Sequence, residues 1–320
     1  MTVMNVSRLI PTAAVAGAVA LGLTALTACS SSDAADHKNG DKLDVVASFY
    51  PMQFLAEQIG GEHVSVTTLT KPGVEPHDLE LSPRQIGGLA DADYILYLKG
   101  IQPAVDDAIG QSGAKDAVDA AKLTTLEDHG TEAGGEEHGH EHHGDEAGAD
   151  PHIWLDPVKY AEVAKGVGKS MAKADPHHAA DYRKNTDALV GKLDALDKAY
   201  ADGLKNTATR TFITTHSAFG YLAERYGLTQ EGIAGVDPEA EPSPARISEI
   251  HTIAKKDRAT TVFFETLASD RTAKTLAKDT GLKTDVLDPL EGITPKSKGA
   301  DYIEVMRSNL AALQKALGAK

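Results

Sequence analysis

The sequence contains almost no cysteine, few aromatic residues and too few basic residues to balance its acidic ones. Cys29 is the only cysteine among 320 residues, so no intramolecular disulfide can form. Aromatic residues make up 5% of the chain, and Trp154 is the only tryptophan. Lysine and arginine number 32 against 47 aspartates and glutamates, which gives a formal net charge of −15. Because nucleic-acid binding requires a basic surface, this charge argues against nucleic acid and favours cations as partners.

The long apolar run near the N-terminus predicts a targeting segment. Arg8 is the one charge before an apolar stretch over residues 9–26, and small residues follow it, as in a secretory signal peptide. The ending Leu-Thr-Ala-Cys resembles a lipobox, the processing signal of bacterial lipoproteins. We therefore expect a lipoprotein signal peptide over residues 1–28 and a lipid anchor on Cys29 that holds the chain to the extracytoplasmic face of a bacterial cell membrane. An incidental cysteine after an ordinary signal peptide, or at the end of an uncleaved membrane helix, is the alternative.

Residues 29–42 are small and polar, which predicts a flexible tether. A lipidated Cys29 would leave no free thiol in the chain, which would exclude a cysteine nucleophile.

Alternating apolar patterns after the tether predict an α/β protein with two lobes. Each lobe is expected to hold a mainly parallel sheet flanked by helices, and one long rigid helix is expected to join them. The expected strands of the first lobe cover residues 43–48, 64–69 and 94–98, and those of the second cover residues 211–214, 228–233, 261–264 and 284–287. The predicted boundaries are an N-terminal lobe over residues 43–177, a linking helix over 178–205 and a C-terminal lobe over 206–320.

A tract rich in histidine and acidic residues interrupts the N-terminal lobe at residues 127–149. It has no apolar period and no basic residue, so we expect a disordered loop that cannot contribute to a core. Imidazole and carboxylate side chains at this density predict weak auxiliary metal binding, although a solvated acidic loop is the alternative. The histidines of this predicted weak site are His129, His138, His140, His142 and His143.

Three further histidines stand in ordered-looking turns rather than in the tract. His77 lies in a proline-flanked turn after a strand, His152 follows Asp150-Pro151, and His216 comes directly after a strand. The carboxyl ends of strands are where α/β sheets place ligand sites, and three imidazoles with one oxygen donor suit tetrahedral Zn²⁺. Asp288, at the end of the last expected strand, is the candidate fourth ligand.

The spacing of these histidines does not itself prove that they converge. Asp288 precedes a proline and could equally be a turn or cap residue, in which case Glu75, Asp78 or a water molecule could complete the site. The remaining histidines of the folded part are interpreted as surface or capping residues: His63, His177, His178 and His251.

The chain resembles the solute-binding lipoproteins of metal ABC transporters, the cluster A-I family, and most closely their zinc-uptake branch. The similarity extends from Leu43 to Leu317. The motifs that carry it are VVASFYPM (45–52), GVEPHDLELSP (73–83), DPHIWLDP (150–157), TTHSAFGYLA (214–223) and DPEAEPSPARI (237–247).

The resemblance implies a metal site between two lobes, with ligands His77, His152 and His216 and, less directly by motif, Asp288. Manganese members of the family place a carboxylate where His216 stands, so an imidazole there implies zinc. A histidine-rich loop before the DPHIW motif is also typical of the zinc branch, where it is implied to capture or sense metal.

We therefore predict an extracytoplasmic zinc-binding protein, a monomer, that delivers Zn²⁺ to the transmembrane subunit of an ABC permease. A zinc hydrolase is a weaker hypothesis, because neither an HExxH motif nor a G-x-S-x-G motif is present. A surface protein for cell adhesion or metal buffering is also weaker, since it would leave the ordered motifs unexplained.

Overall fold

The computed structural model describes residues 42–114, 116–129 and 149–320, which lie in one compact unit that begins at His37. The signal-peptide prediction, the lipidation of Cys29 and most of the tether fall outside the described residues, as do His138, His140, His142 and His143.

The N-terminal lobe is built on a parallel sheet of four strands in the order β2-β1-β3-β4. Central strand β1 (Leu43–Ala47) is almost fully buried, as expected for a strand covered on both faces. Its other strands are β2 (Val64–Thr68), β3 (Tyr94–Tyr97) and β4 (Ala117–Asp119). The flanking elements are α1 (Tyr50–Gly60), η1 (Gly61–His63), α2 (Pro83–Asp91), α3 (Pro103–Ser112), η2 (Ala120–Leu123) and η3 (Ile153–Leu155).

The C-terminal lobe repeats this plan with a second parallel sheet in the order β6-β5-β7-β8. Its strands are β5 (Thr211–Thr214), β6 (Thr229–Gly232), β7 (Thr261–Phe264) and β8 (Lys283–Val286). Its helices are α6 (Gly220–Arg225), α7 (Pro244–Lys256), α8 (Arg271–Thr280) and α9 (Tyr302–Leu317).

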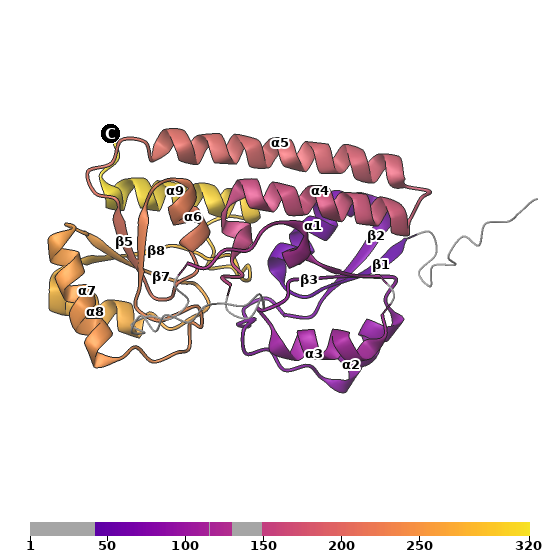
Figure 1. Ribbon diagram of the computed structural model, residues 1–320, viewed down its shortest axis with the longest axis horizontal. Coiled ribbons are helices and arrows are strands. Elements are labelled where there is room, and N and C mark those ends of the chain that lie inside the picture. The colour runs from indigo at the N-terminus through magenta and orange to yellow at the C-terminus, as the bar shows by residue number, and fades with distance from the viewer. Residues whose placement is uncertain (1–41, 115, 130–148) are drawn as a thin grey trace, which may run out of the picture. The chain divides into compact units, whose positions relative to one another are not determined.

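Two helices that lie between β4 and β5 in the sequence connect the lobes. Helix α4 (Pro157–Ala174) packs beside α5 (Ala179–Gly203), and α5 also contacts α1 of the first lobe and α9 of the second (Figure 1). At 1.5 Å per residue, α5 extends about 38 Å. The buried hydroxyl of Tyr200 on α5 donates to the carbonyl of Met306 on α9 over 2.7 Å, which ties this helix to the C-terminal lobe.

Trp154 forms a second connection between the lobes. Its ring is buried against Phe49, and its Nε1–H donates to the carbonyl of Pro289 over 2.7 Å. Its own carbonyl accepts from the hydroxyl of Tyr302 over 2.5 Å. The single tryptophan therefore binds the DPHIW segment to the turn that follows β8.

The predicted fold class is confirmed: two lobes, each with a parallel sheet flanked by helices, are joined by one long helix. That helix begins and ends within the predicted range 178–205. No helix in the described ranges combines the length and the apolar character that a membrane crossing requires.

Candidate metal centre

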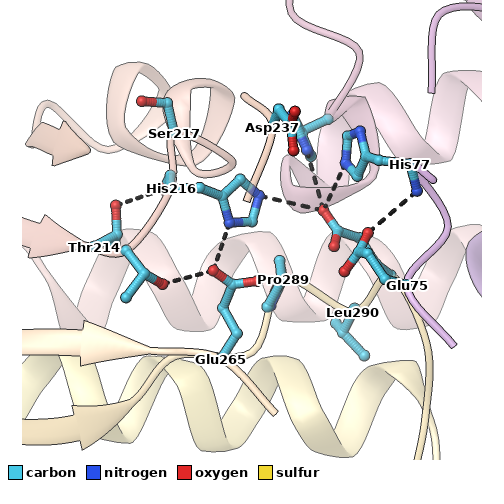
Figure 2. A network of polar contacts seen from close by, with 12 residues as sticks. Glu75, His77, Thr214, His216, Ser217, Asp237, Glu265, Pro289 and Leu290 are labelled. Atoms are coloured by element: carbon cyan, nitrogen blue, oxygen red, sulfur yellow. Dashed lines mark hydrogen bonds and ion pairs between the residues drawn. The ribbon is translucent and has the colours of Figure 1, made fainter. Parts of the chain in front are cut away.

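The three histidines that the sequence singled out meet at one point, and a glutamate joins them. His77, His152, His216 and Glu291 each offer a ligand atom, and these atoms all lie within 4.8 Å of one another. The ring centroids are 5.7 Å apart for His77 and His152, 6.3 Å for His77 and His216, and 5.5 Å for His152 and His216. Figure 2 shows His77 and His216 turned toward the same carboxylate from opposite sides.

Each donor comes from a segment that the fold holds in place. His77 lies in the proline-containing loop between β2 and α2, and His152 directly precedes η3. His216 follows β5, and Glu291 follows β8. Carboxyl ends of parallel strands are where such sheets place ligands, so the two-lobed topology explains why donors so distant in sequence converge.

The distances from the Glu291 oxygen to the imidazole nitrogens match those of a tetrahedral zinc site. The Nε2 atoms of the three histidines lie 3.4, 3.2 and 3.3 Å from Oε1 of Glu291, for His77, His152 and His216 respectively. With Zn–N and Zn–O bonds of about 2.0–2.1 Å, the edge of a coordination tetrahedron is about 3.3–3.4 Å. The carboxylate oxygen therefore already lies at ligand separation from each imidazole nitrogen.

Two buried carboxylates orient the imidazole rings. Nδ1 of His152 lies 2.8 Å from Oδ1 of Asp150, and Nδ1 of His216 lies 2.5 Å from Oε1 of Glu265. Figure 2 shows the pairing of His216 with Glu265, which also accepts from the hydroxyl of Thr215 over 2.6 Å. A carboxylate that accepts from Nδ1–H leaves Nε2 as the metal-binding nitrogen, and such partners are typical of metal-ligating histidines.

Burial and charge shape the protonation of the centre. Burial opposes ionisation of Glu291, but the neighbouring imidazoles, His216 first, outweigh it and hold the pKa of the carboxyl well below its usual range. Burial opposes protonation of His216, yet Glu265 and Glu291 together raise its pKa well above 6.5. The pKa of His152 is also raised: burial lowers it, but the carboxylates of Asp150 and Glu291 raise it by more. Without metal, the centre therefore balances an ionised Glu291 with protonated imidazole.

Polar atoms without hydrogen-bond partners also mark this place as a cation site. Among the described residues, Nε2 of His216 and Oε2 of Glu291 are buried and make no hydrogen bond, although the Nε2 atom lies 3.3 Å from the other Glu291 oxygen. Buried polar atoms are rarely left without a partner in folded proteins. A metal ion between the four side chains would give Nε2 of His216 a partner and would coordinate the carboxylate of Glu291 through its other oxygen.

Glu75 is a second carboxylate at the edge of the centre. Its Oε1 accepts from the backbone N–H of His77 over 3.2 Å, and its Oε2 is buried without a hydrogen-bond partner. Burial, and then the charge of Glu291, raise the pKa of Glu75 to about 9. Glu75 is therefore a neutral acid at neutral pH. Its hydrogen bond with the backbone of His77 helps to shape the loop that carries this histidine.

Asp288, the expected fourth ligand, lies outside this group of four. Its Oδ1 accepts from the backbone N–H of Leu290 over 2.9 Å, and its Oδ2 accepts from the hydroxyl of Thr266 over 3.1 Å. Its backbone N–H donates to Asn309 over 3.0 Å. Asp288 thus closes the turn after β8, which is the turn or cap role that the sequence left open for it.

Sequence reasoning missed Glu291, three residues beyond Asp288. Leu290 between them has a φ of 60°, a left-handed conformation that is uncommon for a non-glycine residue. This turn brings the Glu291 side chain into the interior, where it is fully buried. The only signal in the sequence was an acidic residue within an apolar segment after a strand, in DPLEG.

Of the other histidines, His177 is exposed, and His178 stands at the N-cap position of α5 but makes no side-chain cap hydrogen bond there. The rings of His63 and His178 stack with centroids 4.0 Å apart, and Nδ1 of His178 lies 2.7 Å from Oδ2 of Asp175 at the start of α5. In the His-rich tract the structure differs from the expected disorder at residues 127–129: Glu127 pairs with Asp150 in an antiparallel bridge, and His129 makes defined contacts.

Comparisons with known proteins agree with this architecture. A family model described as ZnuA, zinc-uptake complex component A periplasmic, matches residues 45–316. The high-affinity zinc uptake system protein ZnuA of Bacillus subtilis (strain 168) is 40% identical over 301 residues, which cover 91% of this chain and 93% of that protein.

The zinc-binding lipoprotein AdcA of Streptococcus pneumoniae serotype 4 is 38% identical over 295 residues, 90% of this chain but 58% of AdcA. This chain therefore spans little more than half the length of that relative. The crystal structure of the Zn(II)-bound ZnuA-like domain of S. pneumoniae AdcA is 35% identical and superimposes with a TM-score of 0.71, over 86% of this chain and 99% of that domain.

Proposed function

The chain belongs to the family of periplasmic component A proteins of zinc-uptake complexes, and we propose that it captures Zn²⁺ outside the cytoplasm and delivers it to an ABC-type metal permease. The observation that carries this proposal is the meeting of three imidazole nitrogens with one carboxylate oxygen at 3.2–3.4 Å. The zinc-binding relatives named above support the same metal.

The donor set favours zinc over manganese. Imidazole nitrogen suits Zn²⁺, whereas Mn²⁺ prefers sites with more carboxylate and water oxygen. Four protein donors around one ion would also leave no position open for an activated water molecule, which a catalytic zinc site retains. The geometry therefore supports binding and transfer of the ion rather than hydrolysis.

Capture and release follow from the origin of the donors. His77 and His152 belong to the N-terminal lobe, whereas His216 and Glu291 belong to the C-terminal lobe. A small separation of the lobes would remove two of the four donors at once and release the ion. Helix α5 and the Trp154–Pro289 hydrogen bond limit how far the lobes can separate, so a permease that binds both lobes could trigger release.

Several further properties belong to this proposal. Lipidation of Cys29 would keep the protein at the membrane that holds its permease. The histidines of the tract, at residues 129–143, would raise the local concentration of metal without forming the tight site. We also expect a monomer, because the proposed site is complete within one chain.

Zinc and manganese titrations of the chain from Ser30 to Lys320 test the proposal. Calorimetry should show one tight zinc site, which His216→Ala abolishes, and weaker zinc sites that this substitution leaves intact. Manganese should bind the same site much more weakly. Tight manganese binding, or tight zinc binding that does not depend on His216, would contradict the proposed function while leaving the fold unaffected.

A further inference from the structure

A groove with a basic lining lies between α4 and α5, separate from the candidate metal ligands. Its volume is about 400 Å³, and the basic residues in its lining are Lys165, Lys169, Lys173 and Arg183. Among the described residues, Asp187 is the one acidic residue that lines it. The groove therefore carries an excess of three positive charges on a chain whose net charge is −15.

Helical spacing gathers these charges. Lys165, Lys169 and Lys173 follow one another at intervals of four residues, so they share one face of α4. Arg183 and Asp187 are also four residues apart and share a face of α5. Because α4 and α5 pack side by side (Figure 1), these faces form the two walls of the groove.

Close packing of the two helices fixes the groove. Gly168 on α4 is buried, and a Cβ atom at this position would overlap the hydroxyl of Thr186 on α5. That hydroxyl donates to the carbonyl of Tyr182 over 2.7 Å, within its own helix. Gly168, Thr186 and Ala172 all line the groove, so its lining combines small side chains with long basic ones. The groove is therefore a feature of two packed helices rather than of a loop.

The positive charges of the groove are not neutralised within the described part of the chain. None of the four basic side chains forms an ion pair with a described residue. Two nearby carboxylates are already engaged: Oδ2 of Asp181 lies 3.0 Å from Nε2 of His63, and Asp175 accepts from the hydroxyl of Tyr182 over 2.7 Å. Like charges four residues apart on a helix repel one another. A partner with several negative charges would relieve this repulsion.

The first described strand begins at the end of the helix pair that carries the groove. Leu43 at the start of β1 pairs with Val64 of β2. Val64 directly follows His63, which contacts Asp181 in the first turn of α5. Asp181 is two residues from Arg183 of the groove. The chain that precedes Leu43 therefore joins the folded part close to the basic side chains.

A membrane is the anionic surface that a lipid anchor would bring within reach. Residues 29–42 extend at most about 50 Å, which exceeds the length of about 38 Å for α5. An anchor on Cys29 would therefore keep the groove within reach of phospholipid headgroups. At an ionic strength of about 0.1 M the Debye length is about 10 Å, so acidic residues elsewhere on the chain are screened and do not cancel the local attraction.

We propose that the groove between α4 and α5 docks the protein onto a membrane surface rich in anionic phospholipid, whose headgroup phosphates contact Lys165, Lys169, Lys173 and Arg183. The proposal rests on the lipid anchor that belongs to the proposed function. Each basic residue near an anionic membrane strengthens partitioning about fivefold. The small excess of charge makes the attachment reversible, so the protein can leave the surface to meet its permease.

Partitioning onto vesicles tests the groove without the anchor. The chain from Ser30 to Lys320 contains all the described residues and lacks Cys29. It should sediment with vesicles of equal parts phosphatidylglycerol and phosphatidylcholine, and not with vesicles of phosphatidylcholine alone. In about 1 M salt, where the Debye length falls to about 3 Å, this binding should be lost.

Charge substitutions show whether the groove makes the contact. Lys169→Gln combined with Arg183→Gln should lower the partition coefficient about 25-fold, because two basic residues are lost. Lys255→Gln combined with Lys256→Gln makes the same change of charge at exposed positions on α7 and should have little effect. Asp187→Asn removes the acidic residue of the groove and should raise the partition coefficient about fivefold.

Two results would overturn the inference. The first is the absence of binding to phosphatidylglycerol vesicles, or an equal loss of binding in the two double variants. The second is calorimetric binding of inorganic phosphate that depends on Lys169 and Arg183 but is not accompanied by vesicle binding, which would mean a site for a free anion. The proposed function fails separately, if the unaltered chain lacks a tight zinc site, and every variant here should retain that site because none alters the candidate metal ligands.

Discussion

Replacing Glu291 by alanine should weaken zinc binding at least about 100-fold. Glu291 is the one carboxylate among the four candidate ligands, and its Oε1 atom is the contact that all three imidazoles share. Loss of a carboxylate that merely orients a ligand costs about 10–100-fold in metal affinity. Loss of a direct anionic donor should cost at least the upper end of that range, which corresponds to about 2.7 kcal/mol of binding free energy.

Two matched variants show which property of Glu291 matters. Glu291→Gln keeps an oxygen donor but removes the charge, so its zinc affinity should lie between those of the alanine variant and the unaltered chain. Asp288→Asn removes a charge three residues away, where the carboxylate accepts from Leu290 and Thr266. It should lower the free energy of unfolding by about 1 kcal/mol, because a charge-assisted hydrogen bond becomes a neutral one, and should change zinc affinity far less.

The assay is competition for Zn²⁺ against a chelator of known affinity, combined with denaturant unfolding of each metal-free variant. The unfolding curves show whether a loss of affinity reflects a loss of structure. If Asp288→Asn abolished tight binding while Glu291→Ala preserved it, the assignment of the fourth ligand made from the structure would be wrong, and the ligand expected from the sequence would replace it.

Three further predictions concern the surroundings of the centre. Glu265→Gln should weaken zinc binding about 10–100-fold in the same competition assay, because Glu265 orients the His216 ring. Zinc affinity should increase as pH rises toward and through the pKa of His216, which lies well above 6.5, because below this pKa Zn²⁺ must displace a proton. Calorimetry in buffers of different ionisation enthalpy should detect proton release on zinc binding at neutral pH. Binding without proton release would contradict a protonated centre. Trp154→Phe should lower the free energy of unfolding by about 1–3 kcal/mol in denaturant melts, because it leaves the buried carbonyl of Pro289 without its donor; an unchanged midpoint would show that this carbonyl finds another partner.

The fold could be predicted because local patterns agree with the tertiary structure. Short apolar segments such as LDVVA and TFIT are buried strands. Ser82 and Ser243 each precede a proline and accept from backbone N–H groups at the starts of α2 and α7. The linking helix, predicted over residues 178–205, has apolar residues at helical spacing, and Leu189, Leu193 and Leu196 lie in the core. These features depend on residues close together in the chain.

The structural candidate for the fourth ligand, Glu291, could not be predicted because its position depends on geometry that local patterns do not encode. Asp288 and Glu291 both follow the last strand, and either could reach the histidines in an extended chain. The left-handed backbone of Leu290 and the hydrogen bonds of Asp288 decide between them. The role of Asp150 was equally hidden, since its two oxygens contact histidines 23 residues apart, and one of these lies in a tract expected to be disordered.

The protonation of the metal-free centre explains two properties of a buried site: how it can form without metal, and how it can release a bound ion. Without an ion, the negative charge of Glu291 is balanced by protonated imidazole, so the four side chains remain together in the interior at a tolerable electrostatic cost. Zinc binding exchanges this proton for the ion. Release reverses the exchange, so protonation of His216 lowers the free-energy cost of ion departure. The acidic partner Glu265, which raises the pKa of His216, therefore orients the ring and would favour a proton on it once an ion had left.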